Sequence, residues 1–124
     1  MKGPVNSQCS LEDHAETGLR MPTVRLEALE TAARLFRAVG DTPRLRLLAL
    51  LCQGEAWVTE LARAEGEKIS TISQRLRVLR SEHLVVTQTP GKHISYGLAD
   101  QHVMDLVLNA LAHASEAPAI QQPC

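Results

Sequence analysis

The chain is 124 residues long with a mass of 13.6 kDa, which suffices for one compact domain but not for two independently folded ones. Its 44% hydrophobic and 22% charged residues are typical of a soluble globular protein, and an aromatic share of 2% argues against a β-rich sandwich or barrel. The first residues lack the apolar segment of a signal peptide, and no apolar run approaches the roughly 20 residues of a membrane span, so we expect no membrane partner.

The formal net charge of −1 is unevenly distributed along the sequence. Residues 1–69 sum to −1, residues 70–93 to +3 and residues 94–124 to −3. A basic segment that borders an acidic one allows a local phosphate-binding face in a chain of nearly neutral charge.

The cysteines predict a reducing compartment. There are three of them, far apart and without Cys-x-x-Cys spacing, so neither a disulfide framework nor a thiolate zinc knuckle is expected. We therefore expect a cytoplasmic protein.

Polar segments flank the predicted domain. Residues 1–22 contain glycine and proline without a sustained period and predict a flexible N-terminal arm, and residues 117–124, with Pro118 and Pro123, predict a C-terminal tail. Residues 23–116 form the domain between them.

Two helices open this domain. Apolar residues from Leu26 to Phe36 follow helical spacing, which Gly40 ends. Asp41 or Thr42 is suited to cap a second helix, and the five leucines between residues 45 and 51 make it apolar on most sides, as in a buried central helix.

A helix-turn-helix pattern follows. Residues 59–64 predict a short helix, Gly66 a turn, and Ser70 the start of a second helix whose inward stripe consists of Ile72, Leu76 and Leu79.

A hairpin and a last helix complete the domain. Residues 84–89 and 94–98 alternate or are β-branched and flank Pro90-Gly91-Lys92-His93, which predicts a β-hairpin. Asp100 is suited to cap a final helix that runs to about Ser115. The order predicts a mainly α (α+β) winged helix-turn-helix with one β-hairpin wing. A homodimer through its terminal helices is expected from the polar residues of the last helix.

The second helix of the helix-turn-helix carries the candidate DNA-binding residues. With 100° per residue, five side chains fall about 140–260° from Ile72, opposite the buried stripe: Ser70, Thr71, Gln74, Arg77 and Val78. Ser, Thr, Gln and Arg suit phosphates and base edges, and the residues at the flanks and at the wing tip are better placed for phosphates. The alternative is an ordinary solvated helix face. The candidates are Ser70, Thr71, Gln74, Arg75, Arg77, Arg80 and Lys92.

The last helix carries a narrow polar stripe. His113 lies at about 20° from His102, with Asp105, Asn109 and Glu116 at about 300–340°. The two histidines are eleven residues apart, about 16 Å along a helix, so one straight helix cannot hold a single ion between them.

A second copy of this helix would complete a metal site. In an antiparallel pair, Asp100 and His102 of one protomer meet His113 and Glu116 of the other, which gives two sites of two nitrogens and two oxygens per dimer. Four such ligands suit tetrahedral zinc, and cobalt by similar geometry. They leave no open position for a substrate, so we expect no enzyme. A solvated polar face is the alternative that the spacing alone leaves open.

These stretches together resemble the ArsR/SmtB family of metal-responsive repressors, and within it the zinc-sensing SmtB-like branch. The resemblance covers most of residues 24–116, and the spacing of the four proposed metal ligands is its most specific feature. The other matching stretches are Asp41-Thr-Pro-Arg-Leu-Arg-Leu-Leu, Glu60-Leu-Ala, Gly66, Ser70-Thr-Ile-Ser-Gln-Arg-Leu-Arg-Val-Leu, Leu84-Val and Gly91-Lys-His-Ile-Ser-Tyr.

The resemblance implies a function. It implies a homodimer that represses when free of metal, binds an imperfect inverted repeat in double-stranded operator DNA, and releases it when zinc binds between the last helices. The genes it implies serve metal efflux or sequestration, and cobalt, nickel or cadmium are other candidate effectors.

Two departures from the family pattern leave alternatives open. Trp57 stands where members with a second, thiolate-rich site carry a cysteine, although Cys9, His14 and Cys52 provide other ligands. A repressor induced through cysteine chemistry, by arsenite or an oxidant, and a winged-helix protein-interaction module are the alternative functions.

The second departure lies in the helix-turn-helix turn. Glu65 and Glu67 occupy positions that are usually apolar in the family. Either Ile69 takes their place in the core, or the turn is positioned differently from that of other members.

Overall fold

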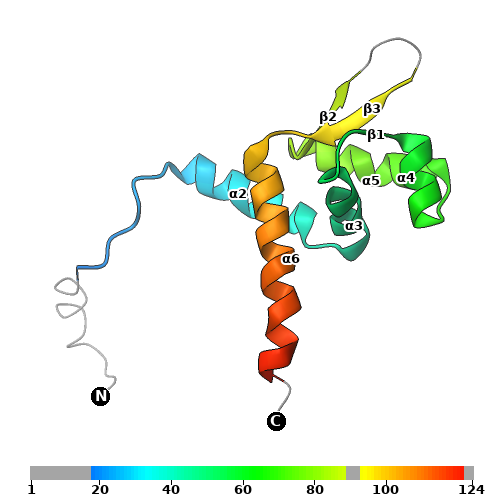
Figure 1. Cartoon of the computed structure of the whole chain (residues 1–124). Coiled ribbons are helices and arrows are strands. Elements are labelled where there is room, and N and C mark those ends of the chain that lie inside the picture. The colour runs from blue at the N-terminus through cyan, green and yellow to red at the C-terminus, as the bar shows by residue number, and fades with distance from the viewer. Residues whose placement is uncertain (1–17, 89–92, 122–124) are drawn as a thin grey trace. The chain divides into compact units, whose positions relative to one another are not determined.

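The computed structural model describes residues 18–88 and 93–121, and the side-chain surroundings among them up to residue 116 (Figure 1). The chain divides into two compact units, residues 1–30 and 31–124. In the described part of the first unit, residues 18–25 are not helical, and helix α2 (Leu26–Val39) begins after them. The predicted arm therefore lies mostly outside the described residues.

The elements of the second unit follow the predicted order. They are the remainder of α2, α3 (Thr42–Leu51), β1 (Ala56–Trp57), α4 (Val58–Glu65), α5 (Ile69–Ser81), β2 (Val85–Gln88), β3 (Ser95–Leu98) and α6 (Gln101–Gln121). This arrangement confirms the winged helix-turn-helix, with α4 and α5 as its two helices and the β2–β3 hairpin as its wing (Figure 1). None of the helices in the described residues is long and apolar enough to cross a membrane.

A polar corner joins α2 to α3. The side chain of Asp41 accepts a hydrogen bond from the Arg44 amide at 3.1 Å, which confirms Asp41 as the helix cap. The Arg44 side chain turns back and donates from Nε to the Ala38 carbonyl at 2.8 Å, near the end of α2. A Cβ at Gly40 would lie 3.1 Å from the Phe36 carbonyl, so this position favours glycine. The corner thereby satisfies backbone groups of both helix ends.

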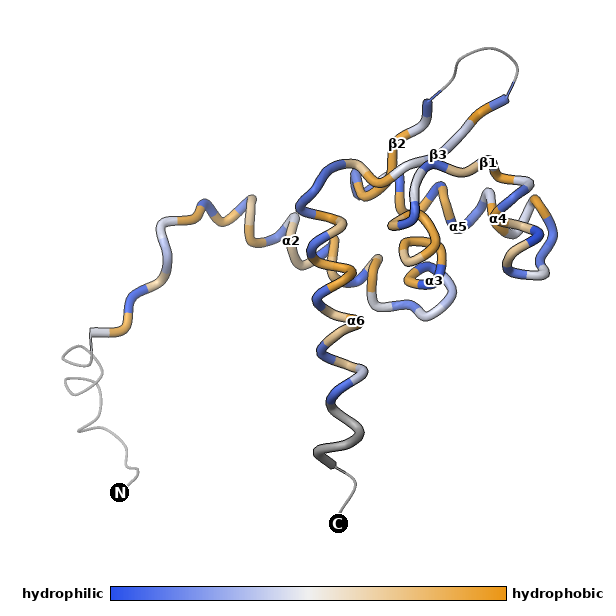
Figure 2. Tube along the Cα trace, viewed as in Figure 1, coloured by the Kyte–Doolittle hydropathy of each residue, from blue (hydrophilic) through white to orange (hydrophobic). Residues whose placement is uncertain are grey.

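The core is built around α3, which packs against α5, β3 and α6. Figure 2 shows the hydrophobic stretches of α3 and α5 in the interior of the unit. The predicted inward stripe of α5 is confirmed, because its three members have no exposed area. The buried core residues are Ala38, Val39, Leu47, Leu48, Leu51, Leu61, Ala62, Ile72, Leu76, Leu79, Leu84, Val85, Val103 and Val107.

The sheet has a third strand that the sequence did not predict. Its order is β1-β3-β2, all antiparallel, with Val86 opposite Gly97 and Ala56 opposite Tyr96. β1 has only two residues, too few to show an alternating pattern, and it forms because β3 offers a free edge.

The last helix extends further than expected. α6 continues to Gln121, past the predicted end near Ser115 and through part of the predicted tail. Pro118 removes only one amide donor, and the helix turn before it, at Ala114, is exposed, where water can bond the carbonyl that loses its partner.

Candidate nucleic-acid interface and metal-binding stripe

The turn between α4 and α5 sets the direction of α5. Gly66 ends α4 in the left-handed conformation, with φ of 66°, and the Glu67 amide donates to the Ala62 carbonyl at 3.0 Å. Burial of the inward stripe of α5 then leaves its opposite face exposed.

The structure leaves most of the predicted DNA-binding residues of α5 exposed. Ser70, Gln74, Arg77 and Arg80 are exposed, while Thr71 and Arg75 are half-buried. Arg77 Nη1 donates to Gln74 Oε1 at 3.3 Å, so the two side chains best suited to read base edges lie side by side. Lys92 lies outside the described residues.

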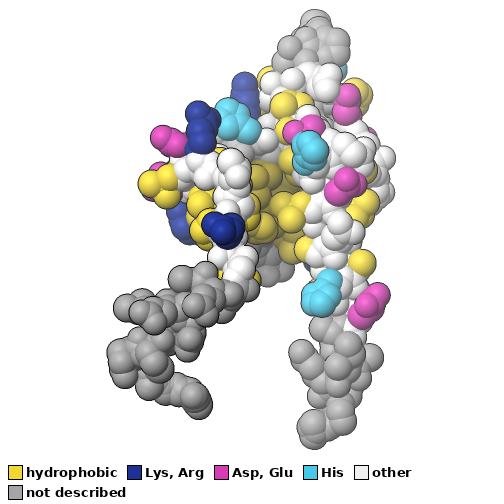
Figure 3. Space-filling view, turned by 90° about the vertical axis from the view of Figure 1, so that its left-hand side faces the viewer, with side chains coloured by type: hydrophobic (Ala, Val, Ile, Leu, Met, Phe, Trp, Pro, Cys, Tyr) yellow, Lys and Arg dark blue, Asp and Glu magenta, His cyan; other side chains and the backbone are white. Residues whose placement is uncertain are grey.

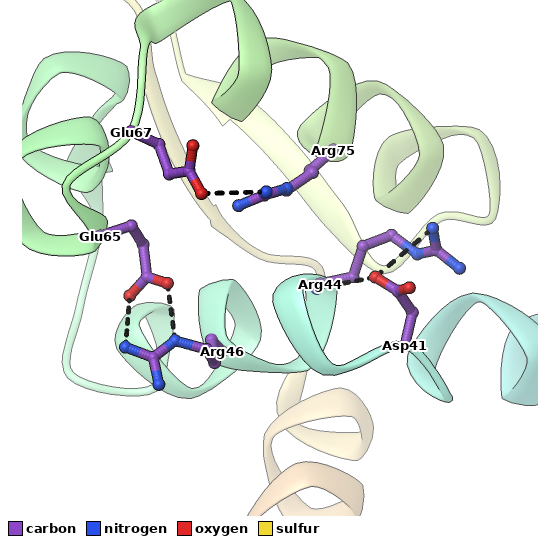
Figure 4. Close-up of polar contacts among 6 residues, drawn as sticks. All are labelled: Asp41, Arg44, Arg46, Glu65, Glu67 and Arg75. Atoms are coloured by element: carbon purple, nitrogen blue, oxygen red, sulfur yellow. Dashed lines mark hydrogen bonds and ion pairs between the residues drawn. The ribbon is translucent and has the colours of Figure 1, made fainter.

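The two acidic residues of the turn each hold an arginine (Figure 4). Arg46 of α3 bonds Glu65 through Nε at 2.7 Å and Nη2 at 3.3 Å, and the Glu65 side chain is only 7% exposed. This hydrogen bond and the carboxylate charge raise the pKa of Arg46 above its ordinary value, so it stays charged. Arg75 Nη2 lies 3.2 Å from Glu67 Oε2.

One expectation for this turn is wrong. Ile69 is 49% exposed and does not enter the core. Ile69 does not need to fill the core in place of Glu65, because the Glu65 side chain is itself buried and its carboxylate is paired with Arg46.

The proposed metal ligands lie on the exposed side of α6. Asp100, His102, His113 and Glu116 are all exposed, opposite the buried Val103 and Val107. Figure 3 shows histidine and acidic side chains following one another down this helix.

Asp100 has a structural task as well. Its Oδ1 accepts a hydrogen bond from the Val103 amide at 3.0 Å, which confirms it as the cap of α6, and its Oδ2 makes no hydrogen bond among the described residues. This hydrogen bond orients the carboxylate and leaves Oδ2 available for the proposed metal ion.

A single protomer does not bring the four ligands together. Among the described residues of the chain, no group of three or more His, Cys, Asp or Glu side chains could hold a metal ion. Two imidazoles and two carboxylates form a donor set that zinc accepts. However, Asp100 and His102 lie at the start of α6, whereas His113 and Glu116 lie about three turns further along. The site needs a second α6.

The second unit also exposes large apolar side chains. Phe36 of α2 is 58% exposed and Leu108 of α6 is 47% exposed. Leu111 is half-buried. Hydrophobic side chains are visible beside the histidine and acidic side chains of α6 in Figure 3.

Trp57, at the position where a cysteine would be needed for the second, thiolate-rich site, belongs to an aromatic stack. Trp57 and His93 stack with their ring centroids 5.1 Å apart. The Trp57 amide donates to Glu60 Oε1 at 2.8 Å, so this carboxylate satisfies a backbone donor at the start of α4. Neither contact was predicted, because the stack depends on the pairing of β1 with β3.

The cysteines offer little for a second site in the described residues. Cys52 is half-buried, and burial raises the pKa of its thiol. Cys9 and His14 lie outside the described residues.

Comparison with known proteins places the chain in a family. Residues 41–87 match the model for bacterial regulatory proteins of the arsR family. The chain is 38% identical over 92 residues, 74% of its length, to a transcriptional repressor SmtB homolog of Synechocystis, of which the match covers 70%. It is 37% identical over 103 residues, 82% of its length, to the regulator NmtR of Mycobacterium tuberculosis, of which 86% is covered.

A solved structure supports the same assignment. The homodimeric winged helix-turn-helix DNA-binding domain of a Mycobacterium bovis protein superposes with a TM-score of 0.71 at 31% identity. The match covers 79% of the chain and 91% of that domain.

Proposed function

Because the chain belongs to the arsR family of bacterial regulatory proteins, we propose that it is a metal-responsive transcriptional repressor whose DNA affinity falls when zinc binds between two α6 helices. The observation that carries the proposal is the presence in one fold of an exposed polar face on α5 and an exposed Asp/His/His/Glu stripe on α6. We take the repressor function from the SmtB homolog of Synechocystis.

The DNA-binding part of the proposal is assigned to α5. Its outer face enters the major groove, where Gln74 and Arg77 suit base edges and Ser70, Thr71, Arg75 and Arg80 suit bases or phosphates. Lys92, at the wing tip, is assigned to a phosphate. A two-fold repressor requires a two-fold operator, so we propose an imperfect inverted repeat as its target.

The dimer part is supported by the apolar surface. Phe36 and Leu108 are exposed on two helices that lie outside the helix-turn-helix, and the related Mycobacterium bovis domain is homodimeric. A second copy would cover these side chains.

The metal part follows from two-fold symmetry. If two α6 helices pack antiparallel, Asp100 and His102 of one protomer face His113 and Glu116 of the other, once on each side of the axis. These residues would hold a zinc ion at each site, and a bound ion would cross-link the two protomers. Cobalt, nickel and cadmium are alternative ions for this donor set.

The metal and the operator compete through the shape of the dimer. Zinc can lower DNA affinity only if its four ligands meet more favourably in one particular dimer geometry. In that geometry the two α5 helices must be badly spaced for successive major grooves. The coupling is reciprocal, so operator DNA must weaken zinc binding by the same factor.

Two substitutions separate the two activities. Arg77→Ala should weaken DNA binding and leave zinc binding intact, because Arg77 lies on α5, away from the ligands of α6. His113→Gln should leave the DNA affinity of the metal-free protein intact and abolish its response to zinc. The measurements are fluorescence anisotropy with labelled duplexes from the region upstream of the gene, with and without zinc, and zinc affinity by competition with a chelator.

A cobalt titration of the reduced protein tests the donor set. Intense tetrahedral absorption bands that saturate at about one ion per protomer, without a sulfur charge-transfer band, support the Asp/His/His/Glu site. A strong sulfur band would favour a cysteine-based inducer instead, and if both variants lost both activities the assignment of separate sites would be wrong.

A further inference from the structure

The ion pair between Glu67 and Arg75 joins the turn of the helix-turn-helix to α5. Arg75 lies on α5 among the proposed DNA-binding residues, and Glu67 lies just before α5 begins. Arg75 Nη2 donates to Glu67 Oε2 at 3.2 Å, and the side chains are 21% and 39% exposed (Figure 4). The guanidinium is therefore bound to an internal carboxylate, whereas no hydrogen bond or ion pair holds the Arg80 side chain among the described residues.

We propose that Glu67 is a positioning residue that withholds Arg75 from DNA phosphates and so lowers the affinity of the protein for DNA of any sequence. This inference rests on the proposed DNA-binding function of α5. The carboxylate acts through Arg75 in two ways, because it occupies donors of the guanidinium and because it offsets the positive charge that Arg75 would present to a phosphate.

The neighbouring pair, between Glu65 and Arg46, is more strongly bonded and its carboxylate is more deeply buried. Glu65 is 7% exposed and is held by two hydrogen bonds from Arg46, so it joins α4 to α3. Glu67 is the more exposed carboxylate of the two, with 39% of its side chain accessible, and it binds Arg75 through one hydrogen bond. An exposed pair of this kind contributes little to folding, which leaves its effect on DNA binding as its main consequence.

The effect should be independent of sequence. Phosphate contacts position a protein on the duplex and carry no base information. Each phosphate neutralised by a lysine or arginine also makes the logarithm of the binding constant fall by about 0.9 more per logarithmic unit of salt concentration. Releasing Arg75 from Glu67 should therefore raise affinity and steepen the salt dependence together.

The test uses Glu67→Gln in the full-length, metal-free protein. Affinity for a fluorescein-labelled 40-base-pair duplex of mixed sequence is measured by anisotropy at several salt concentrations. We expect the affinity to rise by roughly two- to fivefold for each protomer engaged, the range set by an exposed ion pair, and the salt slope to steepen by about 0.9 per protomer. Thermal unfolding should change little.

Two further variants isolate the role of Arg75. Glu30→Gln removes the same charge from α2 at an exposed position for which no hydrogen bond or ion pair is seen among the described residues, and it should leave the salt slope unchanged. In an Arg75→Gln background, the gain from Glu67→Gln should disappear, because the cycle removes the guanidinium through which the carboxylate acts.

The outcomes separate this inference from the proposed function. If the original protein binds the duplex but Glu67→Gln binds no more tightly, or if its gain persists without Arg75, the inference is wrong and the proposed function stands. If neither the original protein nor Glu67→Gln binds this duplex or the upstream duplexes, the proposed function fails and the inference falls with it.

Discussion

Asp100 is the residue in which the fold and the proposed metal site meet, and two substitutions can separate its tasks. Its Oδ1 accepts the Val103 amide at 3.0 Å and caps α6, while the carboxylate is also a proposed zinc ligand. Asparagine caps helices as well as aspartate does, whereas alanine does not. Asp100→Asn should therefore keep the cap and weaken zinc binding, and Asp100→Ala should lose both.

The expected magnitudes follow from the hydrogen bond and the charge. Loss of an N-cap costs about 1 kcal/mol, which for a domain of this size corresponds to a fall in Tm of about 3–6 °C for Asp100→Ala. Asp100→Asn should lose only about 0.3–0.5 kcal/mol, from the missing charge near the helix N-terminus. Both variants should bind zinc more than tenfold more weakly, since even the outer partners of metal ligands contribute about 10–100-fold.

Two assays check these values. Urea unfolding of the metal-free protein at fixed protein concentration gives the free energy of unfolding, and chelator competition gives the zinc affinity. Asp105→Asn is the matched control, because it removes a carboxylate from the same exposed side of α6 at a residue that is not a proposed ligand. Among the described residues, the Asp105 side chain accepts a hydrogen bond only from Gln101, at 2.9 Å. Unchanged zinc affinity in Asp100→Ala would refute Asp100 as a ligand, and equal destabilisation by Asn and Ala would refute the cap.

Two other predictions concern stability and the cysteine. Asp41→Ala should lower the free energy of unfolding by about 1 kcal/mol, measured by urea unfolding, because it removes the acceptor of the Arg44 amide at 3.1 Å; a loss below about 0.3 kcal/mol would contradict the role of the cap. Burial raises the pKa of the Cys52 thiol, so in a Cys9→Ser, Cys124→Ser background iodoacetamide should modify it more slowly in the folded than in the urea-unfolded protein at pH 8. Equal alkylation rates in the two states would refute this argument. Because the pKa of the Cys52 thiol is raised in the folded state, its ionisation favours the unfolded state once the pH rises above the ordinary thiol pKa of 9.0. Cys52→Ala should therefore reduce the loss of stability between pH 9 and 10.

Local patterns were sufficient for most of the fold. The cap at Asp41, the glycine at position 66 and the inward stripe of α5 each depend on residues within about two helical turns, and each is confirmed. The sequence did not predict β1, because a two-residue strand forms only through its pairing with β3. The stack of Trp57 on His93 has the same origin, since the two residues are far apart in the sequence.

The candidate site shows where a helical wheel stops being informative. Periodicity placed Arg75 at a flank of the outer face of α5 but gave no sign that a carboxylate eight residues earlier would bind it, since Glu67 lies in the turn before α5 and outside the helical pattern. The same turn was expected to need Ile69 in the core, and instead a buried carboxylate is balanced by Arg46, nineteen residues away in sequence.

These ion pairs change how the basic charge of α5 should be counted. A sequence sum treats every arginine as available to DNA, although Arg75 already holds a carboxylate and Arg77 shares a hydrogen bond with Gln74. Binding a phosphate through Arg75 must first break or share its bond to Glu67, whereas Arg80 has no such cost among the described contacts. For the described arginines of α5 we therefore expect DNA affinity to depend less on their number than on the hydrogen bonds to protein acceptors that each must break. The salt slope of Glu67→Gln measures that difference directly.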